Sequence, residues 1–102
     1  MDIRSIQDQA WKNKLAKGFN ANDVALEFGL LTAEVGEAFT AWRKRLPDLG
    51  EELADILIYL VGLAEMTRID LGTEVERKLG KNAARAYEAG PDDVLRRVEG
   101  ST

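Results

Sequence analysis

The sequence predicts an all-α protein with four principal helices packed as a bundle. Apolar residues recur at spacings of three and four in four successive segments, and short stretches with Gly, Pro or Asn separate them. No segment alternates apolar and polar residues as a strand does. The 102 residues indicate one domain, with a core over about residues 2–88 and a tail over 89–102. A core this small favours self-association into a homodimer or homotetramer.

The first helix is expected from Asp2, which can cap it, to about Ala16, with Gly18 ending it. One side of this segment carries an apolar stripe with helical spacing. The stripe consists of Ile3, Ile6, Ala10, Trp11 and Leu15.

The second and third helices are predicted to form an antiparallel hairpin. The second begins at a cap over residues 22–23 and runs to about Arg45, because Pro47 forbids its continuation. The segment Asp48–Glu51 has the form of a capping box, so the third helix should run from about Leu49 to Thr67.

The fourth helix is expected after an interruption of the apolar pattern over Ile69–Gly72. Thr73 offers a cap with Glu76 three residues later, and the helix should continue through Tyr87. A short last helix over Pro91–Val98 is also expected, because proline favours the first helical position.

The composition excludes several classes of function. The formal charge is −4, from 18 acids and 14 bases, which argues against a general basic surface for nucleic acid. No apolar run is long enough to cross a bilayer, so no membrane partner is expected. The chain has no cysteine and begins without a secretory signal pattern, which fits the cytoplasm.

Four acids form the pattern that carries the chemistry. Glu34 and Glu37 lie three residues apart in the second helix, and Glu52 and Asp55 repeat that spacing in the third. Each pair shares one helix face, and the hairpin would bring all four together, with Glu37 and Asp55 at nearly the same height. Mg²⁺, Mn²⁺ or Ca²⁺ would neutralise such an all-oxygen cluster. The alternative, a solvated first turn that complements the helix dipole, suits only the second pair.

The third helix carries two stripes. One is apolar: Leu53, Ile56, Leu57, Leu60, Leu63 and Ala64. The other continues from the acids along a separate face: Glu52, Asp55, Tyr59, Gly62 and Met66. An aromatic hydroxyl that follows two acids on one face favours a metal site beside a pocket.

These motifs resemble those of the MazG-like all-α nucleoside triphosphate pyrophosphohydrolases of the short single-domain type. The family hallmark is Glu-x-x-Glu, a spacer and Glu-x-x-Asp, and the likeness extends over roughly residues 24–87, including the tail Lys78–Tyr87. The resemblance implies a Mg²⁺-dependent hydrolase, with Mn²⁺ as a substitute, that converts a (deoxy)nucleoside triphosphate to its monophosphate and pyrophosphate. Such enzymes remove unwanted nucleotides from the pool.

The resemblance also implies roles for individual residues. The four acids would hold the metal, and Glu34 or Glu37 would accept the proton of the attacking water. The fourth helix would bind phosphates through Lys78, Lys81, Asn82 and Arg85. The base would stack on Tyr59, Trp11 or Phe19. Glu27, seven residues before Glu34, is interpreted as a structural ion-pair residue.

Two alternatives stay open from the sequence. One is an enzyme similar to the phosphoribosyl-ATP pyrophosphohydrolases, which the Glu-Val-Gly-Glu-Ala and Lys-Asn-x-x-Arg segments disfavour. The other is a helical dimerisation module that binds metal or nucleotide without turnover. The spacer between the acid pairs is short, so the sequence leaves the base and sugar of the substrate open.

Overall fold

A computed structural model describes residues 1–85, 87–89 and 95–98 of the chain. Its element order is α1 (Ile3–Ala16), α2 (Val24–Arg43), α3 (Leu49–Met66), α4 (Leu71–Ala84), β1 (Tyr87–Ala89) and β2 (Leu95–Arg97). The all-α fold class is confirmed. Contacts divide the chain into two units, residues 1–71 and 72–102, and each is described by itself.

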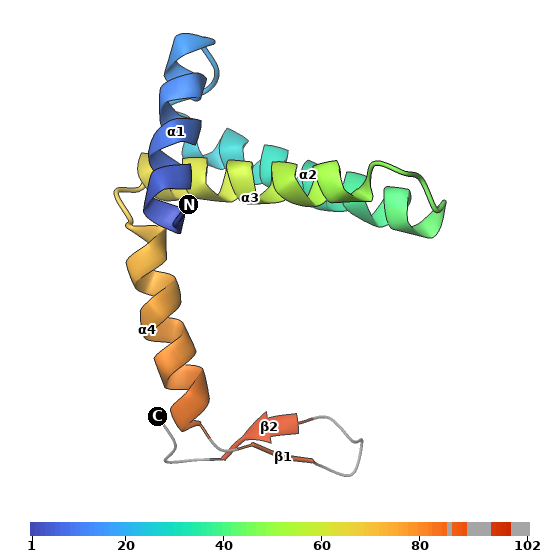
Figure 1. The fold of residues 1–102 in the computed structure, drawn as a ribbon, viewed down its shortest axis with the longest axis vertical. Coiled ribbons are helices and arrows are strands. Elements are labelled where there is room, and N and C mark those ends of the chain that lie inside the picture. The colour runs from blue at the N-terminus through green and yellow to red at the C-terminus, as the bar shows by residue number, and fades with distance from the viewer. Residues whose placement is uncertain (86, 90–94, 99–102) are drawn as a thin grey trace. The chain divides into compact units, whose positions relative to one another are not determined.

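The first unit is built on α2 and α3, which lie side by side and are joined by a short turn (Figure 1). This is the helical hairpin predicted from Pro47. Helix α1 packs against α3 and crosses the pair at the end away from that turn (Figure 1). Helices α1, α2 and α3 therefore meet at that end of the hairpin.

Each of the first three helices ends in the same hydrogen-bonded motif. After α1, Gly18 has φ +70° and the Phe19 amide donates to the Lys14 carbonyl at 3.0 Å. Arg45 and Arg68 take the same left-handed conformation after α2 and α3, with φ values of 55° and 60°. This Schellman geometry satisfies carbonyls that a helix end leaves unpaired. The two arginines show that tertiary structure can impose a positive φ without glycine.

The predicted starts of α1 and α2 are confirmed by their caps. Asp2 accepts a hydrogen bond from the Ser5 amide at 2.8 Å, and Asp23 accepts one from the Leu26 amide at 3.0 Å. A side-chain acceptor at this position satisfies one of the free amide groups of the first turn.

Two helix predictions near the C-terminus need correction. Helix α4 begins at Leu71 rather than after Thr73, and it ends at Ala84 rather than Tyr87. Its start is supported by Gln7, whose Oε1 accepts from the Leu71 amide at 3.2 Å, a distant cap that local sequence cannot reveal.

The expected helix over Pro91–Val98 is wrong for Leu95–Arg97, which forms β2 in an antiparallel pair with β1. The register pairs Tyr87 with Arg97 and Ala89 with Leu95. Residues 91–94 of that predicted helix lie outside the described part. Strands of three residues are too short to show an alternating pattern.

The apolar core of the first unit is small. Its buried apolar residues are Ala38, Ala41, Val61, Leu63 and Ala64. On α1 the most buried side chains are polar, Gln7 and Lys14, whereas Leu15 of the predicted apolar stripe is 53% exposed. Part of the apolar stripe on α3 also faces outward, including Leu53, which is 55% exposed. Hydrophobic burial within one chain is therefore limited.

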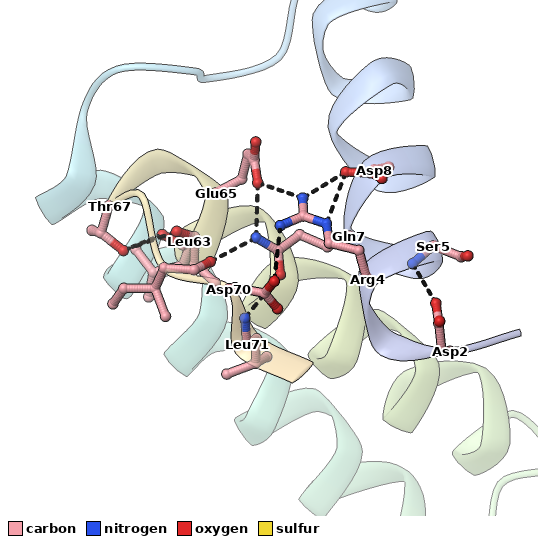
Figure 2. A network of polar contacts seen from close by, with 12 residues as sticks. Asp2, Arg4, Ser5, Gln7, Asp8, Leu63, Glu65, Thr67, Asp70 and Leu71 are labelled. Atoms are coloured by element: carbon pink, nitrogen blue, oxygen red, sulfur yellow. Dashed lines mark hydrogen bonds and ion pairs between the residues drawn. The ribbon is translucent and has the colours of Figure 1, made fainter. Parts of the chain in front are cut away.

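A polar network holds α1 against the C-terminal end of α3 (Figure 2). Gln7 is fully buried, and its Nε2 donates to Glu65 Oε2 and to the Ile69 carbonyl, both at 2.8 Å. Arg4 donates to the same Glu65 oxygen at 2.9 Å. The hydrogen bonds from Arg4 and then Gln7 lower the pKa of the Glu65 carboxyl. Directional bonds thus replace part of the missing apolar packing.

Within the part of the chain that the structure describes, no helix combines the length and apolarity needed to cross a membrane.

Replacing Gln7 by Ala should destabilise the protein by about 2 to 4 kcal/mol, because it leaves buried groups of α3 and the start of α4 without partners. Chemical denaturation monitored by circular dichroism measures the change. Gln9→Ala, at an exposed position of the same helix, is the matched control and should change stability by less than about 0.5 kcal/mol. Equal stability of the two variants would contradict the structural role of the network.

Candidate metal centre

Three of the four predicted metal ligands meet between α2 and α3. Glu34, Glu37 and Glu52 each place one carboxylate oxygen so that the three atoms lie within 4.8 Å of one another. The spacing of three residues puts Glu34 and Glu37 on one face of α2, and the hairpin brings Glu52 opposite them. Divalent cations with oxygen ligands fit a cluster of this kind.

Asp55 lies beside this group rather than within it. It is exposed, and it is not one of the three residues whose oxygens meet. Its negative charge nevertheless raises the pKa of both Glu34 and Glu52, so all four acids interact electrostatically. An aspartate is one methylene shorter than a glutamate, which limits its reach from one helix turn farther along α3.

The electrostatics of the cluster favour a bound cation. Burial is the largest cause that raises the pKa of Glu34 to about 7, followed by its hydrogen bond with Glu37 and the charge of that residue. Burial also raises the pKa of Glu52, with the charge of Glu37 next. One oxygen of Glu34 and one of Glu52 are buried without a hydrogen-bond partner. Such oxygens are costly unless a proton or a cation neutralises them, so these residues fit a metal.

Asp48 lies beside the cluster and acts on it through its charge, although the sequence indicated only a helix cap. Its side chain makes no capping hydrogen bond, and its Oδ1 is buried without a partner. Its charge contributes to the raised pKa of Glu52, which follows one turn later on α3. The spacing of four residues from Glu52 was the available signal.

An open cavity of about 450 Å³ adjoins the acids near the α2–α3 turn. Its lining residues are Ala33, Gly36, Glu37, Thr40, Ala41, Leu46, Asp48 and Glu52. A methyl group added at Gly36 would meet nothing within 4 Å, so there is free space beside the first acid pair.

A second cavity, of about 410 Å³, lies between α1, α2 and α3. This volume is typical of small-molecule sites. Its lining residues are Ala10, Asn13, Lys14, Phe19, Asn20, Glu27, Leu30, Asp55, Ile58, Tyr59 and Gly62. Asp55 thus connects the acid cluster to a pocket that also contains aromatic and amide groups.

Two of the three predicted base-binding residues line this pocket, Phe19 and Tyr59. Phe19 is 58% exposed at the α1–α2 link, whereas Tyr59 is half-buried on the same side of α3 as the acids. Burial and then the charge of Glu34 raise the pKa of the Tyr59 hydroxyl, so it stays a hydrogen-bond donor at neutral pH. Trp11 is half-buried and is not among the lining residues.

The pocket wall contains a buried ion pair, as predicted for Glu27. Lys14 Nζ lies 2.6 Å from Glu27 Oε2, and Glu27 is fully buried. Asn20 donates to the other Glu27 oxygen at 3.2 Å. The burial of Lys14 was not predicted from the sequence, because a single lysine on a mostly polar helix is normally a surface residue. Its spacing of seven residues from Gln7 was the signal of a common face.

The predicted phosphate-binding residues lie in the second unit. Lys78, Lys81 and Asn82 are exposed on α4, and Arg85 donates to Asn82 Oδ1 at 3.2 Å just after the helix ends. Their role stays a prediction from the resemblance.

The fold is shared with a solved structure, the cyanophage S-2L MazG-like pyrophosphohydrolase bound to dGDP and three catalytic Mn²⁺ ions per active site. The similarity has a TM-score of 0.76 and covers 99% of this chain and 96% of that one. The chain has a MazG-like fold. The identity between the two sequences is 23%, so the likeness establishes the fold. No family model and no curated protein matches the sequence.

The resemblance inferred from the acid motif is thus confirmed for the fold. The MazG-like fold comes with the same helical hairpin that carries Glu34, Glu37 and Glu52 in this chain.

Without metal, the protein should become less stable as the pH rises from about 5 to 7. Glu34 ionises near 7 when folded and near its ordinary value of 4.5 when unfolded, so the folded state binds more protons in that interval. Thermal unfolding in EDTA at several pH values measures this slope. Mn²⁺ should raise the unfolding temperature more at pH 7.5 than at pH 5.

The Glu34→Gln variant has no ionisable group at this position. Its stability in EDTA should therefore fall less than that of the wild type as the pH rises. Glu51→Gln, at an exposed position of α3, should keep the wild-type slope. Identical pH profiles for the wild type and Glu34→Gln would argue against the raised pKa.

Proposed function

We propose that this protein is a nucleotide pyrophosphohydrolase that requires a divalent metal. The observation that carries the proposal is the meeting of Glu34, Glu37 and Glu52 within 4.8 Å, with two buried oxygens that lack partners. The protein with which the chain shares its fold is a pyrophosphohydrolase bound to dGDP and Mn²⁺. The proposed reaction is the hydrolysis of a (deoxy)nucleoside triphosphate to the monophosphate and pyrophosphate.

The four acids of the motif would hold the metal, with Mg²⁺ as the resident ion and Mn²⁺ as a substitute. A bound cation would polarise the phosphates and favour deprotonation of the attacking water. Glu34 or Glu37 would accept the proton of that water, because a carboxylate oxygen within the cluster is close to any reacting group there. The rigid hairpin would keep these oxygens in place without reorganisation during the reaction.

The pocket beside Asp55 would receive the nucleoside. Its aromatic side chains, Phe19 and Tyr59, offer flat apolar contact to a base. Asn13 adds an amide group that can hydrogen-bond the base or the sugar, whereas Asn20 already donates to the Asp23 carbonyl and to Glu27. We further propose that Lys81 of α4 and Arg85, which follows the helix end, bind the outer phosphates, because cationic side chains suit multiply charged groups. Removal of unwanted nucleotides in the cytoplasm is the proposed cellular role.

The protein should release pyrophosphate from nucleoside triphosphates in the presence of Mg²⁺ or Mn²⁺, and EDTA should abolish the reaction. Asp55→Ala should lower metal affinity and reduce kcat by about a hundredfold or more, because it removes a negative charge next to the cluster. A coupled pyrophosphate assay over a panel of nucleotides, with a metal titration for each variant, measures both effects.

Glu51→Ala is the matched control, since this exposed acid is adjacent to Glu52 and should leave the rate unchanged. Lys81→Ala should raise KM for the triphosphate while leaving metal affinity intact. Release of orthophosphate in place of pyrophosphate would overturn the assignment. Binding of metal and nucleotide without turnover would instead identify a non-catalytic module.

We also propose that the protein works as a homodimer or a larger homo-oligomer. A stripe on α2, about a quarter of a turn around the helix from the buried Glu27, is apolar and exposed, with Phe28 at 55%, Phe39 at 54% and Trp42 at 65%. Helix α3 also exposes large apolar side chains: Leu53, Leu57 and Leu60. Monomeric proteins rarely leave so many large apolar side chains in water, and the small core makes a second copy the natural cover.

Light scattering of the wild type at micromolar concentration should give the mass of a dimer or a larger oligomer. Phe39→Glu should shift this mass toward the monomer, because it places a charge in the middle of the apolar stripe. Glu76→Lys, an exposed charge change on α4, serves as the control and should leave the mass unchanged. A wild-type protein that stays monomeric at these concentrations would contradict the proposal.

A further inference from the structure

The pocket beside the acid cluster contains an ionic group that the proposed reaction does not use. Lys14 and Glu27 both line it, and both are buried, with side-chain exposures of 11% and 1%. Burying a charged pair is expensive and contributes little net stability compared with apolar residues of the same size. A buried pair at a pocket wall therefore invites a functional explanation.

The acceptors of this ion pair are occupied, whereas its donors are not all used. Both oxygens of Glu27 already accept, one from Lys14 at 2.6 Å and the other from Asn20 at 3.2 Å. The Lys14 ammonium has three N–H donors, and its contacts within residues 1–85 comprise the bond to Glu27 and a position 5.9 Å from the centre of the Tyr59 ring. The pair thus offers the pocket unused donors and few free acceptors.

The position of the pair relative to the acids suits a nucleoside. Glu27 precedes Glu34 by seven residues of α2, and Gly62 follows Asp55 by seven residues of α3, which is about 10 Å in each helix. Gly62 lies opposite Glu27, because a methyl group added there would be 3.7 Å from Glu27 Oε2. The pocket accordingly has the acids at one end and the ion pair at the other. Phosphates at the acids would direct a base toward Lys14.

We propose that Lys14 makes this pocket select nucleobases that present a carbonyl oxygen over bases that present an amino group at the same position. The inference rests on the proposed function, and it specifies the substrate class of that site. An ammonium donates to a carbonyl oxygen, whereas an amino group is itself a donor and would leave both groups without an acceptor. Glu27 fixes the direction of the Lys14 ammonium through their hydrogen bond, so it acts as a positioning residue.

Matched nucleotides test this selection directly. Hypoxanthine and adenine differ at position 6 by a carbonyl or an amino group, and uracil and cytosine differ in the same way at position 4. Titration calorimetry with Mn²⁺ gives Kd for dIMP against dAMP and for dUMP against dCMP. The wild type should bind the carbonyl member about tenfold more tightly in at least one pair, the factor that one charge-assisted hydrogen bond supplies. Steady-state kinetics with the triphosphates should show the same preference in KM.

The decisive variant is the double replacement Lys14→Met with Glu27→Gln, which removes both charges together and avoids an unpaired buried carboxylate. Its preference should fall to within about twofold, the level expected when no charged donor discriminates. Lys12→Met is the matched control, because Lys12 is an exposed lysine of the same helix, and it should keep the wild-type preference. Circular dichroism establishes that each variant is folded.

Glu27→Gln alone provides a second test if the double variant does not fold. It removes the carboxylate that fixes the direction of the Lys14 ammonium, so the preference for the carbonyl base should weaken. Equal affinity of the wild type for both members of each pair would overturn the inference while leaving pyrophosphohydrolase activity in place. An undiminished preference in the double variant would also overturn it. Failure of every nucleotide to bind with metal would remove the proposed function and the inference together.

Discussion

Repulsion between carboxylates is the constraint on which the first unit depends. The α2–α3 hairpin holds three of them within 4.8 Å, and a fourth acts on them electrostatically. Such an arrangement opposes folding unless a proton or a cation enters it. The hairpin must therefore be held by other forces, and its apolar core of mostly small residues supplies only part of them. Polar contacts from α1 supply another part, which explains why its buried side chains are Gln7 and Lys14.

Local chemistry made much of the fold predictable. Asp2 and Asp23 act as caps, Pro47 separates α2 from α3, and the acid spacing placed Glu34, Glu37 and Glu52 together. The predictions that were wrong concern residues whose contacts the local sequence does not show. Asp48 has the sequence of a cap, yet its side chain makes no capping hydrogen bond, and its charge acts on Glu52 of the acid cluster. The start of α4 is supported by Gln7, 64 residues earlier in the chain.

The pocket was predictable only in part for the same reason. Tyr59 follows from the helical spacing of the acids, so its place on the pocket wall could be expected. The place of Lys14 on the pocket wall could not be expected, because its burial depends on Glu27 across the pocket and on Asn20 in the link between the helices. Sequence patterns locate a face of one helix, but they do not show which face of another helix covers it.

The hydrogen bonds of Gln7 limit how the length of α1 can change. They fix the rotation of α1 about its own axis, and the same rotation points Lys14, two turns later, at the pocket. A residue inserted between the two would turn Lys14 by about 100° and remove it from the wall. An insertion in the link over residues 17–22 would leave that alignment untouched. Changes in length should therefore be tolerated in the link and excluded from the helix.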